Sequence, residues 1–183
     1  MSKWWLVSWT TYGTWLPGDK RGYCTRRGEV YVPPPRRYTR PGEATYKAAA
    51  HTGVRELAEE LCDSAVYFDR SEKETAFRAM NTEIDKIAIA PAIISVGRWH
   101  VHWLCYFGTL EIRRVVARVK AAATRELNLN GFRGKRPWTK GCNIKSKATR
   151  RECRSAYKYI ADHEQQGCLI HKWALDSVYL RFD

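Results

Sequence analysis

The sequence predicts an α+β domain of ferredoxin-like (RRM-like) type, in which helices cover an antiparallel sheet. The expected elements follow the order strand, helices, strand, strand, helix, strand, helix, and no internal repeat interrupts it. The clearest strand signal is the apolar run from Ile93 to Phe107, which breaks at Gly97-Arg98 as a hairpin would. A length of 183 residues suits a single domain over 1–183 with a sizeable core.

The first half of the chain is expected to hold one strand, a basic loop and two helices before the hairpin. The loop covers about 19–43, is rich in Gly, Pro and Arg, and cannot be helical at Pro33-Pro34-Pro35. Ser71, with Glu74 three residues on, predicts a capping box at the start of the second helix. The expected elements are a strand over 4–12, a turn over 13–18, helices over 44–61 and 71–85, and hairpin strands over 87–96 and 100–107.

The second half is expected to add a helix over 110–127, a short strand over 138–144 and a helix over 148–167. The last of these has an apolar stripe at helical spacing, formed by Cys153, Ala156, Tyr157 and Ile160. Thr149 is its expected N-cap, and Gly167 its expected end. The tail at about 168–183 is expected to pack on its own domain or on a second subunit.

Two histidines lie one residue apart inside the apolar run, at His100 and His102. Side chains alternate along a strand, so both project from one face of the sheet. Imidazole is the commonest metal ligand at neutral pH, and such a pair can present two nitrogens to one ion. By itself the pair is more often an ordinary feature of a sheet, because a metal site needs a third ligand.

A third imidazole is available on the helix over 148–167, where Tyr159 and His163 are four residues apart and lie on one helical face. If that face lies on the sheet beside the histidine pair, three imidazoles and one phenol come together. The simpler alternative is that Tyr159 only packs and His163 is solvated.

A His-hydrophobic-His strand followed by a helix bearing Tyr-x-x-x-His resembles the single-tyrosine HUH transposases, the insertion-sequence enzymes and the REP-associated tyrosine transposases (RAYT). The resemblance implies an HUH endonuclease fold in which His100, His102 and His163 hold Mg²⁺ or Mn²⁺. It also implies that Tyr159 is the nucleophile of single-stranded DNA nicking and strand transfer, through a 5′-phosphotyrosine intermediate. The chain departs from the Tyr-Ile-x-x-Asn-Pro pattern common in REP-associated members, so no narrower subfamily follows.

Three imidazoles also suit Zn²⁺. A metal-dependent nuclease without a covalent step therefore stays open beside the transposase. A non-catalytic nucleic-acid-binding module of the same fold is the third function class. For the transposase, the base that takes the Tyr159 proton is not identified by the sequence; the metal, Asp162, Glu152 and water are the candidates.

The charge balance favours a polyanionic partner, because 32 Lys and Arg stand against 19 Asp and Glu, a formal charge of +13. Basic residues interleaved with aromatic residues suit single-stranded DNA with hairpins, which is the partner the resemblance implies. A basic protein with solvated faces is the simpler alternative. The residues expected to contact DNA, chosen by charge alone, are Arg113, Arg114, Arg118, Lys120, Arg133, Lys135, Arg136 and Lys140.

The six cysteines show no C-x-x-C spacing, which argues against a zinc ribbon or a disulfide framework. The N-terminus does not resemble a signal peptide, and the apolar run over 87–96 is too short to span a bilayer. We therefore expect a cytoplasmic protein without a membrane partner. A homodimer is consistent with the family resemblance and is left open by the sequence.

Overall fold

The computed structural model describes residues 3–19, 23–24, 31–32, 49–62, 64–134 and 136–174. These residues belong to two compact units. The larger unit combines Met1–Thr11 with Val66–Asp183, and the smaller unit is Tyr12–Ala65. Each unit is described by itself, and the candidate site lies entirely within the larger one.

The larger unit is built on a five-stranded antiparallel sheet with the strand order β6-β1-β5-β4-β7. Its first four strands in chain order, with helices between β1 and β4 and between β5 and β6, are compatible with a ferredoxin-like arrangement. This confirms the predicted α+β class and antiparallel sheet. The strands are β1 (Trp4–Thr10), β4 (Ala90–Val96), β5 (His100–Tyr106), β6 (Asn143–Lys147) and β7 (Leu169–Lys172).

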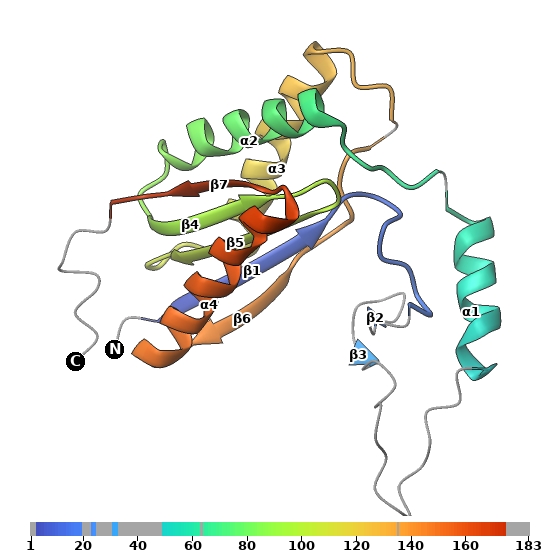
Figure 1. Cartoon of the computed structure of the whole chain (residues 1–183), viewed down its shortest axis with the longest axis horizontal. Coiled ribbons are helices and arrows are strands. Elements are labelled where there is room, and N and C mark those ends of the chain that lie inside the picture. The colour runs from blue at the N-terminus through green and yellow to red at the C-terminus, as the bar shows by residue number, and fades with distance from the viewer. Residues whose placement is uncertain are drawn as a thin grey trace, which may run out of the picture. The chain divides into compact units, whose positions relative to one another are not determined.

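Helices cover both faces of the sheet, as Figure 1 shows. On one face, α2 (Arg70–Ile84) and α3 (Ile112–Leu129) pack on the larger core, to which β5 contributes Val101, Trp103 and Cys105. On the other face, α4 (Arg150–Asp162) packs on a smaller core that includes Leu104 of β5. Because side chains alternate along β5, His100 and His102 lie on the α4 face.

The predicted hairpin is confirmed. Strands β4 and β5 pair from Val96 opposite Val101, and the Gly97 N–H donates to the His100 carbonyl at 2.8 Å. The capping box of α2 was predicted two residues too late. Asp69 is the N-cap, and its partner is Glu72, whose carboxylate accepts from the Asp69 N–H at 3.0 Å. An aspartate caps a helix as well as a serine does, so Ser71 falls inside the first turn.

Two boundaries in the last third of the chain differ from the prediction. The strand expected over 138–144 is β6 at Asn143–Lys147, preceded by a single bridge between Thr11 and Trp138. The sequence Asn-Ile-Lys-Ser-Lys has little apolar character because β6 is an edge strand with mostly exposed side chains. The expected tail at about 168–183 begins with a fifth strand, β7, paired with β4; residues 175–183 lie outside the described residues.

The smaller unit contains a two-stranded ribbon, β2 (Tyr23–Cys24) with β3 (Tyr31–Val32), and the helix α1 (Ala49–Glu60). The ribbon belongs to the segment expected as a loop over 19–43; the rest of that segment after residue 19 lies outside the described residues. Within the unit, the Arg55 guanidinium pairs with Glu59 at 2.7 Å and with Asp19 at 3.7 Å. No helix in the described part of the chain has the length and apolar character needed to cross a membrane.

Candidate metal centre and tyrosine

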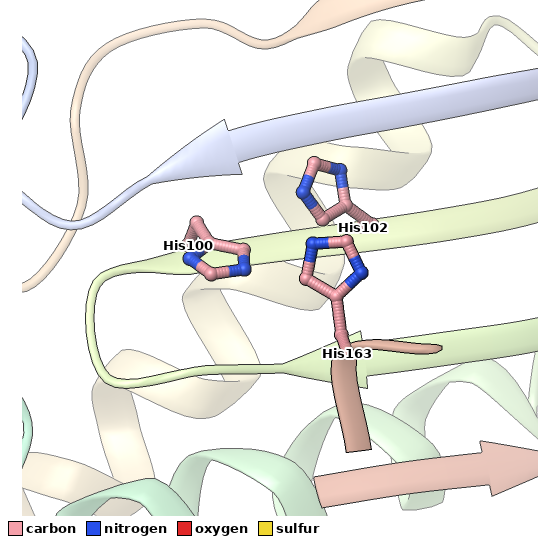
Figure 2. Close-up of side chains that lie close together, drawn as sticks. All are labelled: His100, His102 and His163. Carbon is pink, nitrogen blue, oxygen red and sulfur yellow. The ribbon is translucent and has the colours of Figure 1, made fainter. Parts of the chain in front are cut away.

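Three histidines gather on the α4 face of the sheet. His100 and His102 project from β5, and His163 reaches them from the first residue of the 3-10 turn η1 (His163–Gln166), as Figure 2 shows. The ring centroids lie 5.0 Å apart for His100 and His102, 5.1 Å for His100 and His163, and 4.7 Å for His102 and His163. We call these three residues the His cluster.

The position of α4 follows from its cap and its apolar stripe. Thr149 accepts from the Glu152 N–H at 3.2 Å, while the Glu152 carboxylate accepts from the Thr149 N–H at 3.0 Å. This capping box begins the helix where the sequence predicted. The stripe of Cys153, Ala156 and Ile160 is then buried against the sheet. Tyr159, on the neighbouring helical face, is therefore held at the edge of that contact, beside the N-terminal end of β5.

The orientation of His163 is fixed by its own helix. Its Nδ1 lies 2.7 Å from the carbonyl oxygen of Tyr159. Since a carbonyl can only accept, Nδ1 carries the proton and donates this hydrogen bond. The lone pair of neutral His163 is therefore on Nε2, the arrangement in which second-shell hydrogen bonds orient metal-binding imidazoles.

His102 is held neutral. Burial, followed by the proximity of His100 and of His163, lowers its pKa to about 3. Its Nδ1 is buried and has no hydrogen-bond partner among the described residues. Its cross-strand partner Ser95 is completely buried, and the Ser95 Oγ likewise finds no partner in the part of the chain that the structure describes. His102 and Ser95 are cross-strand partners, so both of these polar atoms belong to side chains on the same face of the sheet as the His cluster.

The His cluster can hold a metal ion. One nitrogen from each residue can be chosen so that all three lie within 4.8 Å of one another. Three nitrogens bound to one tetrahedral ion at about 2.1 Å are about 3.4 Å apart. The longest separation must therefore shrink by up to about 1.4 Å, a movement of the size that rotations of the imidazole rings produce. The ligand set predicted from the sequence is the set that the fold brings together.

Tyr159 stands beside the His cluster. Its Oη lies 3.4 Å from Nε2 of His102, and its ring centroid lies 4.6 Å from that of His163. The side chain is 48% exposed, so a molecule from solvent can reach the phenol. Partial burial, with a smaller contribution from the nearby Cys168, raises the pKa of Tyr159 above its usual value. The phenol is therefore protonated at neutral pH.

The two carboxylates considered as bases for Tyr159 are engaged elsewhere. Glu152 accepts from Ala148 and Thr149 in the cap at the far end of α4. Asp162 pairs with Lys158 through contacts of 2.9 and 3.1 Å.

Cys168 belongs to the same site, although the sequence analysis did not single it out. Its Sγ lies 3.9 Å from Nε2 of His100, and the residue is buried. Gly167 reverses the chain in the left-handed region, with φ 76°, and the Cys168 N–H donates to the His163 carbonyl at 3.2 Å. The signal available in the sequence was a cysteine five residues after His163, past a helix-ending glycine.

The residues of α3 that were expected to contact DNA lie on the opposite side of the sheet from the His cluster. Arg114 pairs with Glu111 at 2.7 Å, and Arg118 pairs with Glu83 of α2. Lys120 is half-buried and donates to the carbonyls of Thr139 and Gly141. Arg113, on the same helix, is exposed. DNA contact by these four residues, which lie on the helix packed against the larger core, stays a prediction.

The other expected DNA contacts lie in the connection between α3 and β6. Arg133, Arg136 and Lys140 are exposed, and Lys135 lies outside the described residues. Comparisons with protein-family models, with curated proteins and with solved structures find no match to this chain.

Proposed function

We propose that this protein is a metal-dependent endonuclease and strand transferase of single-stranded DNA, with Tyr159 as its nucleophile. The observation that carries the proposal is the accessible phenol of Tyr159 placed 3.4 Å from an imidazole of a three-histidine cluster that can hold a metal ion. The resemblance to single-tyrosine HUH transposases supports the same assignment of the four residues.

The proposed ion is Mn²⁺ or Mg²⁺, held by His100, His102 and His163. When bound, a divalent ion supplies Lewis-acid polarisation of a phosphodiester oxygen. The neutral state of His102 and the Nε2 lone pair of His163 fit this role, because an imidazole binds a metal only through an unprotonated nitrogen. Of the two ions, Mn²⁺ fits the all-imidazole set better, because Mg²⁺ is the harder ion and retains its water ligands.

In the proposed reaction, the Oη of Tyr159 attacks the phosphorus and the bond between phosphorus and the 3′ oxygen breaks. The phenol proton passes to a solvent base, and the 3′ oxygen takes up a proton as it leaves. The products are a 5′-phosphotyrosyl bond and a free 3′-OH. Attack by this or another 3′-OH then releases the tyrosine, so the phosphodiester is restored without an external energy source.

The open part of the α4 face offers a path for the substrate. By register, Ser8 and Asn143 continue the row that contains His102, and Lys145 lies in the next row. Asn143 and Lys145 are exposed. A polar strip with a lysine suits the sugar-phosphate backbone of a single strand. We propose that the scissile strand lies along β1 and β6 and reaches Tyr159 from that side.

The experiment is a covalent-trapping assay. The protein is incubated with Mn²⁺ and a pool of single-stranded, hairpin-containing oligonucleotides from the flanks of its own gene, then denatured. We expect an adduct in the wild type that is lost without metal and falls at least about a hundredfold in Tyr159→Phe. Tyr157→Phe, on the same helix and half-buried, is the matched control and should retain the adduct.

Two results would replace the proposal. Cleavage without an adduct, with Tyr159→Phe still active and His102→Ala inactive, would identify a metal-dependent nuclease. Salt-dependent binding of the pool with neither cleavage nor adduct, in the presence of Mn²⁺ and of Mg²⁺, would identify a nucleic-acid-binding module.

A further inference from the structure

We propose that Cys168 is a conditional fourth ligand of the His cluster, recruited by a thiophilic ion such as Zn²⁺ or Co²⁺ and left unused by Mg²⁺ and Mn²⁺. The inference rests on the metal-binding part of the proposed function. It adds a residue that selects between ions and a predicted inhibitor, Zn²⁺.

The distance supports a shared ion. Two ligands of a tetrahedral zinc ion, a sulfur at about 2.3 Å and a nitrogen at about 2.1 Å, are about 3.6 Å apart. The Cys168 Sγ and the His100 Nε2 are 3.9 Å apart. A shift of a few tenths of an ångström brings these two atoms to the spacing of two zinc ligands. Closing the site on His102 and His163 takes a further rotation of the Cys168 side chain, because its sulfur lies outside the group of nitrogens that are within 4.8 Å of one another.

The chain around Cys168 holds the thiol in this position. The Cys168 N–H donates to the carbonyl of His163, a residue of the His cluster, and the Lys73 ammonium donates to the Gly167 carbonyl at 2.6 Å. On the other side, Gly97 leaves the space that the thiol occupies. A Cβ at Gly97 would lie 2.8 Å from the Cys168 Sγ and 3.1 Å from the His100 Cε1.

A second observation indicates that the site takes a ligand. The Ser95 Oγ is completely buried next to His102 on the neighbouring strand and has no hydrogen-bond partner within the described ranges. If His102 binds an ion through Nε2, its protonated Nδ1 needs a hydrogen-bond acceptor, as metal-binding imidazoles generally do. The Ser95 Oγ, on the cross-strand partner of His102, is the acceptor we propose.

The chemistry separates the two classes of ion. Thiolates select soft and borderline ions, of which zinc is the commonest in proteins, whereas Mg²⁺ and Mn²⁺ favour oxygen ligands. On binding, the thiol loses its proton to the buffer and the sulfur joins the three imidazoles. Four protein ligands complete a tetrahedral site and leave no position for a phosphate oxygen. Zn²⁺ is therefore expected to occupy the site and inhibit strand transfer.

The test is an absorption titration of the full-length protein with Co²⁺, which reports its ligands directly. We expect visible d–d bands together with a near-ultraviolet thiolate-to-cobalt charge-transfer band in the wild type. In Cys168→Ser and Cys168→Ala the d–d bands persist, the charge-transfer band is lost and the Co²⁺ affinity falls at least about tenfold. Cys142→Ser, which removes a half-buried thiol elsewhere in the unit, should match the wild type.

The outcomes separate this inference from the proposed function. Visible bands without a charge-transfer band in the wild type, or an unchanged charge-transfer band in both Cys168 variants, would overturn the role of Cys168 and leave the metal site standing. No cobalt bands in any form would overturn both. In the trapping assay, Zn²⁺ added to the Mn²⁺ reaction should inhibit the wild type at a concentration at least about tenfold lower than it needs in Cys168→Ser; equal inhibition would count against the proposal.

Discussion

The Tyr159 Oη lies 3.4 Å from the His102 Nε2, although the two residues are 57 positions apart in the chain. Tyr159 lies on α4, and His102 lies on β5, the central strand of the sheet. The packing of the helix on the sheet, and not local sequence, brings the two side chains together. The contact depends on the burial of α4 against the sheet. The residues around the site can be tested one at a time.

The first prediction concerns acid stability of the metal-free protein. The pKa of His102 is about 3 in the folded protein and near 6.5 when unfolded, so between these values the unfolded state binds one more proton. Because of His102, the free energy of unfolding should fall as the pH drops from about 6.5 toward about 3, by up to about 1.4 kcal/mol per pH unit. Urea unfolding in EDTA at pH 7, 5 and 4 should show a flatter pH dependence for His102→Gln than for the wild type. Parallel curves would contradict the prediction.

The second prediction is that Ser95→Ala has opposite effects on stability and on metal binding. In the metal-free protein the variant removes a buried hydroxyl with no partner in the described part of the chain, and should raise the free energy of unfolding by up to about 1 kcal/mol. In the presence of metal it removes the expected acceptor of the His102 Nδ1–H, and should weaken Mn²⁺ binding by about 10- to 100-fold. Denaturation and calorimetric titration measure the two effects. Equal Mn²⁺ affinity in both proteins would remove Ser95 from the site.

The third prediction concerns Gly97→Ala. The added methyl group would lie 2.8 Å from the Cys168 Sγ and 3.1 Å from the His100 Cε1, so both side chains must move. We expect a loss of stability of about 1–3 kcal/mol, as for other overpacked sites, and weaker binding of Co²⁺. Gly108→Ala is a control at another glycine, where a Cβ meets nothing within 4 Å but φ is 59°. It should lose some stability through backbone strain and keep the wild-type cobalt spectrum.

The fourth prediction separates a structural from a DNA-binding role for Lys120. Its ammonium donates to the Thr139 and Gly141 carbonyls and lies 5.6 Å from the centre of the Trp9 ring. Lys120→Met should lower the free energy of unfolding by about 1–3 kcal/mol, because it leaves those carbonyls without this donor. Arg114→Met, which removes an exposed ion pair, should cost less than about 1 kcal/mol. If Lys120→Met is as stable as the wild type but binds single-stranded DNA less tightly, the contact is with DNA.

The parts of the fold that the sequence predicted correctly are those with strong local patterns. The hairpin follows from apolar β-forming residues on both sides of Gly97-Arg98, and α4 from a capping box and a regular apolar stripe. The edge strands β6 and β7 were misplaced or missed because their side chains are mostly polar or half-exposed. Their pairing is decided by hydrogen bonds to β1 and β4, which leave no periodic mark on the sequence.

The candidate site was predictable to the same extent. The spacing of His100 with His102, and of Tyr159 with His163, places each pair on one face of its element, and the fold brings the pairs together. Cys168 was missed because its spacing after His163 does not by itself place the thiol beside His100; the left-handed turn at Gly167 and the register of β7 also decide that approach. The basic residues of α3 were chosen as DNA contacts by charge alone, and charge does not indicate which face of the sheet a helix covers.

The pairing of β7 with β4 also bears on when the proposed metal site can form during synthesis. Strand β7 follows the Gly167 turn and pairs with β4 at the edge of the sheet, which positions the chain just after His163. It is the last strand in sequence order among the described residues. A nascent chain that has already made β4 and β5 carries two imidazoles without the third. In the proposed metal site, the full ligand set is therefore expected only after β7 has paired with β4, and a chain truncated before Leu169 should bind metal more weakly than the full chain.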